Sequence, residues 1–389
     1  MGTRIRETLL LAALRAIHAL DRRHPDISRL GTADIRNILI VSCTAIGDTL
    51  LSTPAIRSIR QQYPAARISL LLNQAYIPLF ANNPDVDAII PYAGGYRKFF
   101  RLAGALRRER FDLALILHGN EPQATPLAYL SGAPYRFKLP NDNDFRFLLT
   151  NRTPVLRWDD FPHGIDQRLA VAALAGATGT ERSMVLPLSE SAMSRFSERR
   201  QQQGIPADAV LIGFQPGAST ISRRWSVERF AELGRRLLAG RENVWIVLTG
   251  SPGERQLAEQ VANGIGRARV WNLAGALPLD ELPAMVSALR TLVTGDTGPM
   301  HMAVALGTPV VALFAVSRWQ RSGPAYGLER SVVIQKWRTC DPCLSKRCPY
   351  ADPLCMQNIS VDEVEAAVLG QLEGMSGGVR ESTAAEPRP

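Results

Sequence analysis

Short apolar runs alternate along most of the chain with segments of helical spacing. The first run, Asn37–Ser42, is rich in β-branched residues, and a helical segment follows it from about Thr49 to Tyr63. Further strand-like runs lie at 68–72, 88–91 and 113–117. This alternation predicts βαβ units and therefore a parallel sheet covered by helices.

The alternation begins again after a polar helix predicted at 189–203. The pattern predicts strands at 210–215, 244–250, 270–273, 292–294 and 310–314, and helices near 226–239, 254–263, 278–289, 299–306 and 361–371. Two α/β domains in series predict a ligand cleft between them, at the carboxyl ends of both sets of strands.

The domain organisation follows from these patterns. We expect an N-terminal extension (1–34), a first domain (35–190), a linker helix (191–208), a second domain (209–358), a C-terminal helix (359–372) and a disordered tail (373–389) rich in Gly, Ser, Ala and Pro. Residues 119–180 have no clear periodicity, and the segment Leu139–Phe145 suggests a loop over the open edge of the first domain.

The extension contains an amphipathic basic helix at 4–20. Its apolar face includes Leu10, Leu14 and Ile17, and its basic residues are Arg4, Arg6 and Arg15. Such a helix can lie on an anionic membrane surface or pack against its own domain, and both alternatives remain open.

The net charge of +9 favours an anionic partner, which could be a nucleotide, a phosphorylated glycolipid, a membrane surface or a nucleic acid. No apolar run reaches the roughly 18 residues of a membrane span, and the N-terminus lacks a small-residue cleavage site. We therefore expect a cytoplasmic protein.

Four of the five cysteines are clustered, at Cys340, Cys343, Cys348 and Cys355. Their spacing is compatible with zinc, with two disulfides or with free thiols.

The stretch 291–307 predicts a buried strand that turns directly into a helix. Gly295 and Gly298 allow a tight turn, Pro299 suits the first helical position, and Gly307 suits the helix end. The start of such a helix presents unpaired N–H groups and a partial positive charge, which commonly hold phosphate.

The polar residues of this stretch have two interpretations. Asp296 or Thr297 could simply cap the helix. His301, one turn into the helix, could reach a phosphate or sugar, or could be a partly buried histidine without such a role.

The segment 215–225 is the second candidate phosphate site. Ser219 and Thr220 can donate to phosphate oxygens, and Arg223 with Arg224 can neutralise a diphosphate, although arginines are often only solvated charge. No Asp-x-Asp pair occurs at a cleft-facing strand end, which favours stabilisation of the diphosphate without a metal ion.

A third strand-to-helix loop, 248–255, carries Glu254. This carboxylate could complement the helix dipole or accept hydrogen bonds from ribose hydroxyls. The absence of a G-x-G-x-x-G sequence after a strand argues against a nicotinamide enzyme, and no cofactor is expected.

Asp48 follows the first strand of the first domain, at the predicted edge of the cleft. An aspartate there commonly caps a helix. It could instead be a general base for an acceptor hydroxyl, if burial raises its pKa.

With these residues together, the chain resembles glycosyltransferase family 9, the ADP-heptose:lipopolysaccharide heptosyltransferases, over residues 37–371. The matching segments are Ile38–Val41, Ile46–Ala55, Gln215–Ser219, Arg223–Trp225, Gly295–His301 and the cysteine cluster.

The resemblance implies the GT-B architecture, in which two Rossmann-like domains face a central cleft and a C-terminal helix crosses back to the first domain. It implies inverting, metal-independent transfer of heptose from ADP-heptose to the anionic inner core of lipopolysaccharide at the cytoplasmic face of the inner membrane, with no nucleic-acid partner.

Position by position, the resemblance assigns Asp48 as the catalytic base. It assigns Asp296, Thr297, Gly298 and His301 to the donor-binding loop, and Arg223 to a phosphate-binding position where members usually have lysine.

Phe314–Trp319 also departs from the Gly-Pro-Thr-Asp-Pro segment of many members, a difference that bears on the donor's identity. Another nucleotide sugar with a different glycan acceptor, a sugar-nucleotide epimerase and a non-catalytic sugar-nucleotide-binding protein remain alternatives.

Overall fold

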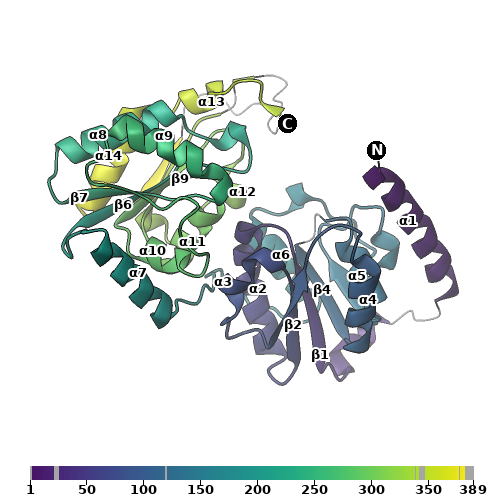
Figure 1. Ribbon diagram of the computed structural model, residues 1–389. Helices are drawn as coiled ribbons and strands as arrows, with labels where there is room; N and C mark the ends of the chain where they lie inside the picture. Colours follow the sequence, from purple (N-terminus) through teal and green to yellow (C-terminus); the bar gives the residue numbers. More distant parts are fainter. Residues whose placement is uncertain are drawn as a thin grey trace. The chain divides into compact units, whose positions relative to one another are not determined.

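The computed structural model describes residues 2–21, 26–118, 121–337, 339–340, 347–375 and 377–381. The chain forms two compact units, Met1–Val185 and Leu186–Pro389 (Figure 1). Each unit has its own parallel sheet with helices on both faces.

The sheet of the first unit has the strand order β3-β2-β1-β4-β5, and all neighbours are parallel. Its strands are β1 (Asn37–Ser42), β2 (Arg67–Asn73), β3 (Ala88–Tyr92), β4 (Leu113–His118) and β5 (Tyr135–Lys138). Nearly every residue of β1 and β4 is buried, which is typical of a parallel sheet covered on both faces.

Helices of the first unit cover the two faces of this sheet (Figure 1). On one face α2 packs against α6, and on the other face α1, α4 and α5 share an apolar cluster with β1 and β4. The helices are α1 (Gly2–Leu20), α2 (Ile46–Gln62), α3 (Ile77–Phe80), α4 (Phe99–Arg108), α5 (Ala124–Leu130) and α6 (Gly164–Ala173), and short 3₁₀ turns lie at Ile27–Thr32, Gln74–Tyr76, Arg146–Leu148 and Trp158–Asp160.

The part of the chain without clear periodicity contains α5, β5 and α6. The pattern missed β5 because it has only four residues, two of them basic. It missed α6 because Gln167 and Arg168 are buried on this helix, so polar residues occupy core positions there.

The sheet of the second unit has the order β12-β11-β10-β9-β6-β7-β8, again with parallel neighbours. Its strands are β6 (Val210–Gln215), β7 (Val244–Leu248), β8 (Val270–Asn272), β9 (Thr291–Gly295), β10 (Val310–Phe314), β11 (Ser331–Gln335) and β12 (Gly378–Glu381). The strand β12 lies in the stretch predicted to be a disordered tail, so that prediction is wrong for these residues. The strand pairs with the outer edge of β11 through backbone hydrogen bonds, which composition does not reveal.

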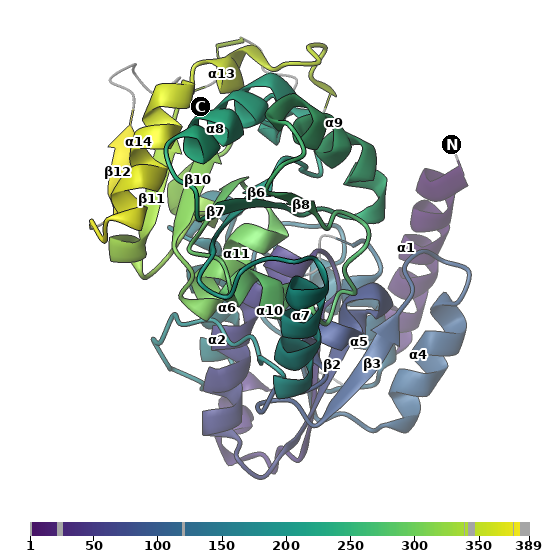
Figure 2. The same cartoon turned by 60° about the vertical axis from the view of Figure 1, so that its left-hand side comes forward.

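Figure 2 shows α8, α9 and α14 on one face of this sheet and α10 and α11 on the other. The helices are α7 (Glu190–Gln202), α8 (Val227–Ala239), α9 (Arg255–Ile265), α10 (Leu282–Ser287), α11 (Gly298–Leu306), α12 (Trp319–Ser322), α13 (Leu354–Gln357) and α14 (Val361–Leu372), and 3₁₀ turns lie at Ile221–Arg223, Pro252–Glu254 and Leu328–Arg330.

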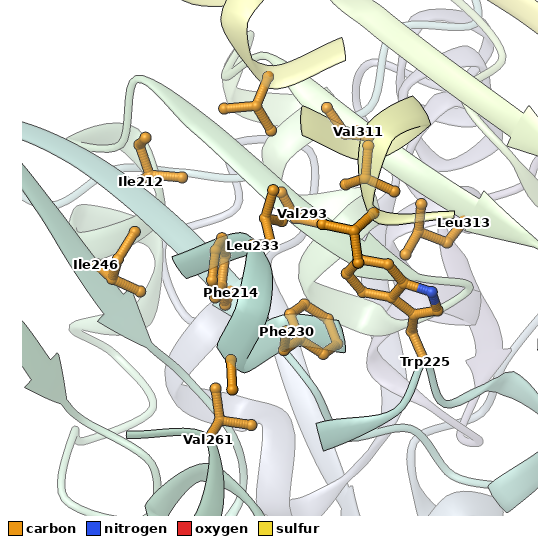
Figure 3. Packing of buried hydrophobic residues seen from close by; sticks show 14 of the residues in the cluster. Ile212, Phe214, Trp225, Phe230, Leu233, Ile246, Val261, Val293, Val311 and Leu313 are labelled. Carbon is orange, nitrogen blue, oxygen red and sulfur yellow. The ribbon is translucent and has the colours of Figure 1, made fainter. Parts of the chain in front are cut away.

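The core of the second unit consists mostly of aliphatic side chains, with Phe214, Trp225 and Phe230 among them (Figure 3). The Trp225 ring meets Phe230 edge-on at 5.0 Å between centroids, and its indole N–H donates to the carbonyl of Ile359 at 3.0 Å. This bond fixes the start of α14, which packs against α8, β9 and β10. The return of this helix to the first domain stays a prediction.

The division between the units falls after Val185, a few residues before the predicted linker helix. That helix is α7, and it packs within the second unit. Phe196 stacks on Trp271 at 5.5 Å between ring centroids, and Arg195 and Arg199 form ion pairs with the buried Glu281 at 3.0 and 3.2 Å.

Two further features concern membranes and metals. None of the described helices is both long and apolar enough to cross a membrane. Within the described residues, no three His, Cys, Asp or Glu side chains are grouped as metal ligands would be. Cys340 and Cys348 are free thiols, so the alternative of two disulfides is wrong, whereas Cys343 lies outside the described residues.

Candidate functional site

Asp48 lies in the first turn of α2, directly after β1. The N-cap residue of this helix is Ala45, which has no side-chain capping bond, so the helix begins earlier than predicted. The interpretation of Asp48 as the N-cap is therefore wrong. The carboxylate contacts other side chains instead.

Three side chains from separate elements surround the Asp48 carboxylate. Arg168 Nη2 donates to Oδ1 at 3.2 Å, and Thr44 Oγ1 donates to Oδ2 at 3.1 Å. His118 Nε2 lies 3.4 Å from Oδ1. The Asp48 side chain stays 31% exposed, whereas that of Arg168 is 1% exposed. These side chains thus hold the carboxylate, which stays partly exposed.

Arg168 is a buried cation, and each of its three nitrogens donates a hydrogen bond within the first unit. Its Nη1 donates to the Gly164 carbonyl at 2.7 Å, and its Nε donates to Ser52 Oγ at 3.1 Å. Burial lowers the pKa of Arg168 to about 10, and the neighbouring Asp48 acts in the opposite direction. Arg168 is therefore protonated at neutral pH and neutralises the Asp48 carboxylate.

His118 ends β4, the strand beside β1, and its Nδ1 lies 2.6 Å from Thr44 Oγ1. Burial lowers the pKa of His118 to about 4, with a further contribution from the positive charge of Arg168. The imidazole is therefore neutral at pH 7. The Thr44 hydroxyl thus lies within hydrogen-bond distance of both His118 Nδ1 and Asp48 Oδ2, and the tautomer of the imidazole sets the direction of the first of these bonds. This arrangement connects imidazole, hydroxyl and carboxylate in one chain.

The low pKa of His118 predicts acid sensitivity. We expect the free energy of unfolding to fall as the pH drops from 6.5 toward about 4, because the unfolded chain binds a proton that folded His118 excludes. The loss should reach up to about 3 kcal/mol. Urea denaturation at a series of pH values measures it, and His118→Gln should flatten this part of the profile. An equally steep profile in the variant would show that another group causes the loss.

The predicted donor-side residues lie at one edge of the second sheet. Strands β7, β6, β9 and β10 are neighbours, and the segments after their carboxyl ends carry the polar side chains. The predicted residues Ser219, Thr220, Arg223, Arg224, Glu254, Asp296, Thr297, Gly298 and His301 follow β6, β7 and β9, and the segment after β10 adds Ser317 and Ser322. The structure thus brings together four segments that are far apart in sequence.

Asp296 is buried, with 8% of its side chain exposed, and joins three of these segments. Its Oδ2 accepts from Ser317 Oγ at 3.0 Å and from Ser322 Oγ at 3.2 Å, and lies 3.3 Å from Arg223 Nη1. Asp296 does not occupy the N-cap position of α11, which is Thr297. The capping interpretation of Asp296 is therefore wrong.

The start of α11 has no side-chain cap from Thr297 either. The Thr297 hydroxyl lies 2.8 Å from that of Thr294 and makes no capping bond. The first-turn N–H groups thus keep the arrangement that an anion-binding helix start requires. At the other end, Gly307 has φ +74° and terminates the helix as predicted. His301 is buried on this helix, and its ligand role stays a prediction.

Arg223 and Arg224 have different environments. The Arg223 side chain is 35% exposed beside Asp296, whereas Arg224 donates from Nε and Nη2 to the Ala218 carbonyl at 3.2 and 2.9 Å. Arg224 thus braces the loop that carries Ser219 and Thr220. Gly295 is required here, because a Cβ at this position would lie 2.6 Å from the Arg223 carbonyl oxygen.

Glu254 has a defined structural role. Its Oε2 accepts from the Ser251 N–H at 2.8 Å and from the Ser251 hydroxyl at 2.9 Å, in a capping box. The Gly217 backbone passes so close that a side chain there would overlap the Glu254 carboxylate. A ribose contact of Glu254 stays a prediction.

Sequence reasoning did not find Thr44, His118 or Arg168. His118 could have been predicted from the sequence, because a polar residue at the carboxyl end of a strand is expected at the edge of the sheet where ligands bind. Arg168 gave none, because neither its burial nor its distance to Asp48 follows from the local pattern.

Comparison with known proteins identifies the type of enzyme. The family model for glycosyltransferase family 9 (heptosyltransferase) matches residues 99–352, more than half of the chain. The chain belongs to this family. It is therefore a glycosyltransferase, as the matching segments in its sequence imply.

Relatives of this glycosyltransferase are heptosyltransferases. Lipopolysaccharide heptosyltransferase 2 of Escherichia coli (strain K12) is 28% identical over 293 residues, which cover 72% of this chain and 83% of that protein. Lipopolysaccharide core heptosyltransferase OpsX of Haemophilus influenzae is 24% identical over 349 residues, which cover 87% and 96%.

The solved structure of E. coli ADP-heptose lps heptosyltransferase II matches this glycosyltransferase with a TM-score of 0.71 and 26% identity, covering 87% of this chain and 99% of that one. The fold class is α/β of the GT-B type, with two Rossmann-like domains, as predicted.

Proposed function

We propose that this glycosyltransferase transfers a heptose from ADP-heptose to the inner core of lipopolysaccharide, with inversion at the anomeric carbon and without a metal ion. The names of its relatives support the donor and acceptor classes. The observation that carries the mechanism is the Asp48 carboxylate, which is held by Arg168 and left partly exposed at the carboxyl edge of its sheet.

Asp48 is the general base in this proposal. Its carboxylate removes the proton of an acceptor hydroxyl as that oxygen attacks the anomeric carbon, and the bond to the diphosphate breaks, so ADP leaves with the bonding electrons. Thr44 and Arg168 fix the carboxylate, which limits its side-chain motion. Attack from the face opposite the leaving group inverts the anomeric centre.

The second unit stabilises the departing diphosphate. Arg223 and Arg224 supply positive charge, Ser219 and Thr220 supply hydroxyl donors, and the first turn of α11 supplies N–H groups. A charged hydrogen bond contributes roughly 1.5–3 kcal/mol and a favourable helix terminus up to about 2 kcal/mol. Since each ~1.4 kcal/mol is about tenfold in rate, this set can support departure without a metal ion.

The acceptor in this proposal is an anionic glycolipid core, and the excess of positive charge, +9 over the chain, favours its approach. Arg223 replaces the lysine usual in the family. Its planar fork suits two phosphate oxygens at once, so it retains the charge and changes the geometry of the contact.

Mass spectrometry of lipopolysaccharide from a strain lacking this protein tests the proposal. We expect a core truncated by one heptose, restored by the intact gene and not by the gene for Asp48→Asn. An unchanged core would exclude this acceptor. Incubation of the purified protein with ADP-heptose alone distinguishes a transferase from an epimerase. Only an epimerase converts the donor to an epimer when no acceptor is present.

A further inference from the structure

Helices α1 and α4 of the first unit border an open groove of about 1120 Å³. Figure 1 and Figure 2 both show α1 running beside α4. Most of the groove is lined by apolar side chains of the two helices, and the end of α5 contributes Tyr129 and Leu130. The groove involves neither Asp48 nor the predicted donor residues.

One side of α1 holds it on the first unit. Leu10 and Leu14 are buried in the same cluster as Phe99 and Ala103 of α4. His18 meets the Tyr129 ring edge-on at 5.9 Å between centroids. The prediction that this helix packs against its own domain is therefore correct for these residues.

The same helices also expose large apolar side chains. Leu9 is 65% exposed, Ile17 48% and Leu20 84% on α1, and Phe100 is 77% exposed on α4. Leu9, Ile17 and Phe100 all line the groove. Packing within the unit therefore uses only part of the apolar surface of the pair, and a substantial patch is left for a partner.

The charged residues that line the groove are all basic. Arg6, Arg97 and Arg107 line the groove, and its lining includes no Asp or Glu. The acidic Glu7 of α1 lines a different pocket, together with Lys138. No carboxylate among the described residues forms an ion pair with Arg97 or Arg107, so their charge is available to an external anion.

We propose that the α1–α4 groove docks on the surface of an anionic phospholipid bilayer. Leu9, Ile17 and Phe100 enter the boundary between headgroups and acyl chains, and the arginines contact headgroup phosphates. A second copy of the chain fits less well, because a twofold contact between two grooves would bring the arginines of one copy close to the same arginines of the other. This docking rests on the proposed function, since it would hold the transferase at the surface where a lipid-linked acceptor lies. The vesicle-binding experiment that tests the docking does not depend on sugar transfer.

Sedimentation of the full chain with vesicles tests the docking. We expect binding to vesicles of phosphatidylglycerol with phosphatidylethanolamine, weakened by salt, and little binding to phosphatidylcholine alone. Arg97→Ser with Arg107→Ser should reduce the affinity by on the order of 10-fold or more. The control pair Arg29→Ser with Arg36→Ser removes two exposed arginines from the same unit and should change it much less.

A second pair of double variants tests the contribution of the exposed apolar side chains to vesicle binding. Leu9→Ser with Phe100→Ser should weaken vesicle binding by about tenfold or more, because two large side chains no longer enter the bilayer. Val155→Ser with Met193→Ser changes two apolar residues that are 42% and 40% exposed elsewhere and should leave binding intact. Thermal unfolding of each variant verifies that it is folded.

Absence of vesicle binding, or equal losses in groove and control variants, would overturn the proposal. A dimer that dissociates in the groove variants, with no vesicle binding, would identify a second copy as the occupant and also overturn it. If vesicles bind as expected but no sugar is transferred to any core acceptor, the proposed function fails and the docking stands.

Discussion

Replacing Asp48 with asparagine is expected to lower the turnover of sugar transfer by about 10²–10⁴-fold, the usual contribution of a general base. The amide has nearly the same shape, and its oxygen can still accept from Arg168 while its NH2 group faces the Thr44 hydroxyl oxygen, but it cannot take the acceptor proton. Steady-state kinetics at saturating donor measures this loss.

Two controls separate catalysis from binding and folding. Asp48→Asn should bind ADP-heptose like the parent in calorimetry, whereas Arg223→Ala should bind it about 10-fold to 150-fold more weakly, because it loses a charged phosphate contact. Asp85→Asn alters a buried carboxylate that pairs with Arg57 in the same unit and should retain turnover. Parent-like turnover in Asp48→Asn would remove Asp48 from the mechanism.

Replacing Arg168 with methionine is expected to destabilise the protein by roughly 2–4 kcal/mol. The variant loses its bonds to Gly164 and Ser52 and leaves the Asp48 carboxylate without its cation. The effect is smaller than for a wholly buried ion pair, because Asp48 is 31% exposed and water can solvate it. Equilibrium denaturation measures the loss.

Arg136 provides the matched comparison for Arg168. It is also buried in the first unit, but it donates to backbone carbonyls, including those of Leu148 and Pro134. Arg136→Met should therefore destabilise the fold without changing the turnover of folded molecules. Arg168→Met should lower both, and Arg168→Lys should restore part of the turnover through its charge. Equal turnover in the two methionine variants would make Arg168 a purely structural residue.

The sequence pattern predicted most of the strands that are continuous apolar runs. Strand β1 has the predicted bounds, and β4 extends one residue beyond the prediction, to His118. Both strands were predictable because the parallel sheet buries nearly all of their side chains, which makes them apolar runs. Strands β5, β11 and β12 were missed. Strands β5 and β12 are short and pair at sheet edges through backbone groups, and β11 has only three apolar residues between Ser331 and Gln335. Local composition does not report such pairing.

The candidate site was predictable where chemistry follows a strand end. Asp48 and Asp296 were selected on that basis, and both lie at the carboxyl edges of their sheets. Their neighbours were not predictable in the same way, because Arg168 reaches Asp48 from 120 residues away and Ser322 reaches Asp296 from 26. Ser317 lies in the segment that departs from the usual family sequence, so this departure supplies a hydroxyl to Asp296.

If Arg223 holds the diphosphate as proposed, its contact with Asp296 has a consequence for ligand selection. An arriving anion has to compete with a fixed carboxylate for the same guanidinium, and it also meets that carboxylate's negative charge at close range. A weakly charged compound gains little from this exchange, whereas a diphosphate brings enough charge to draw the guanidinium away and to engage the start of α11 as well. In the proposed mechanism, Asp296 therefore favours a diphosphate over a singly charged anion.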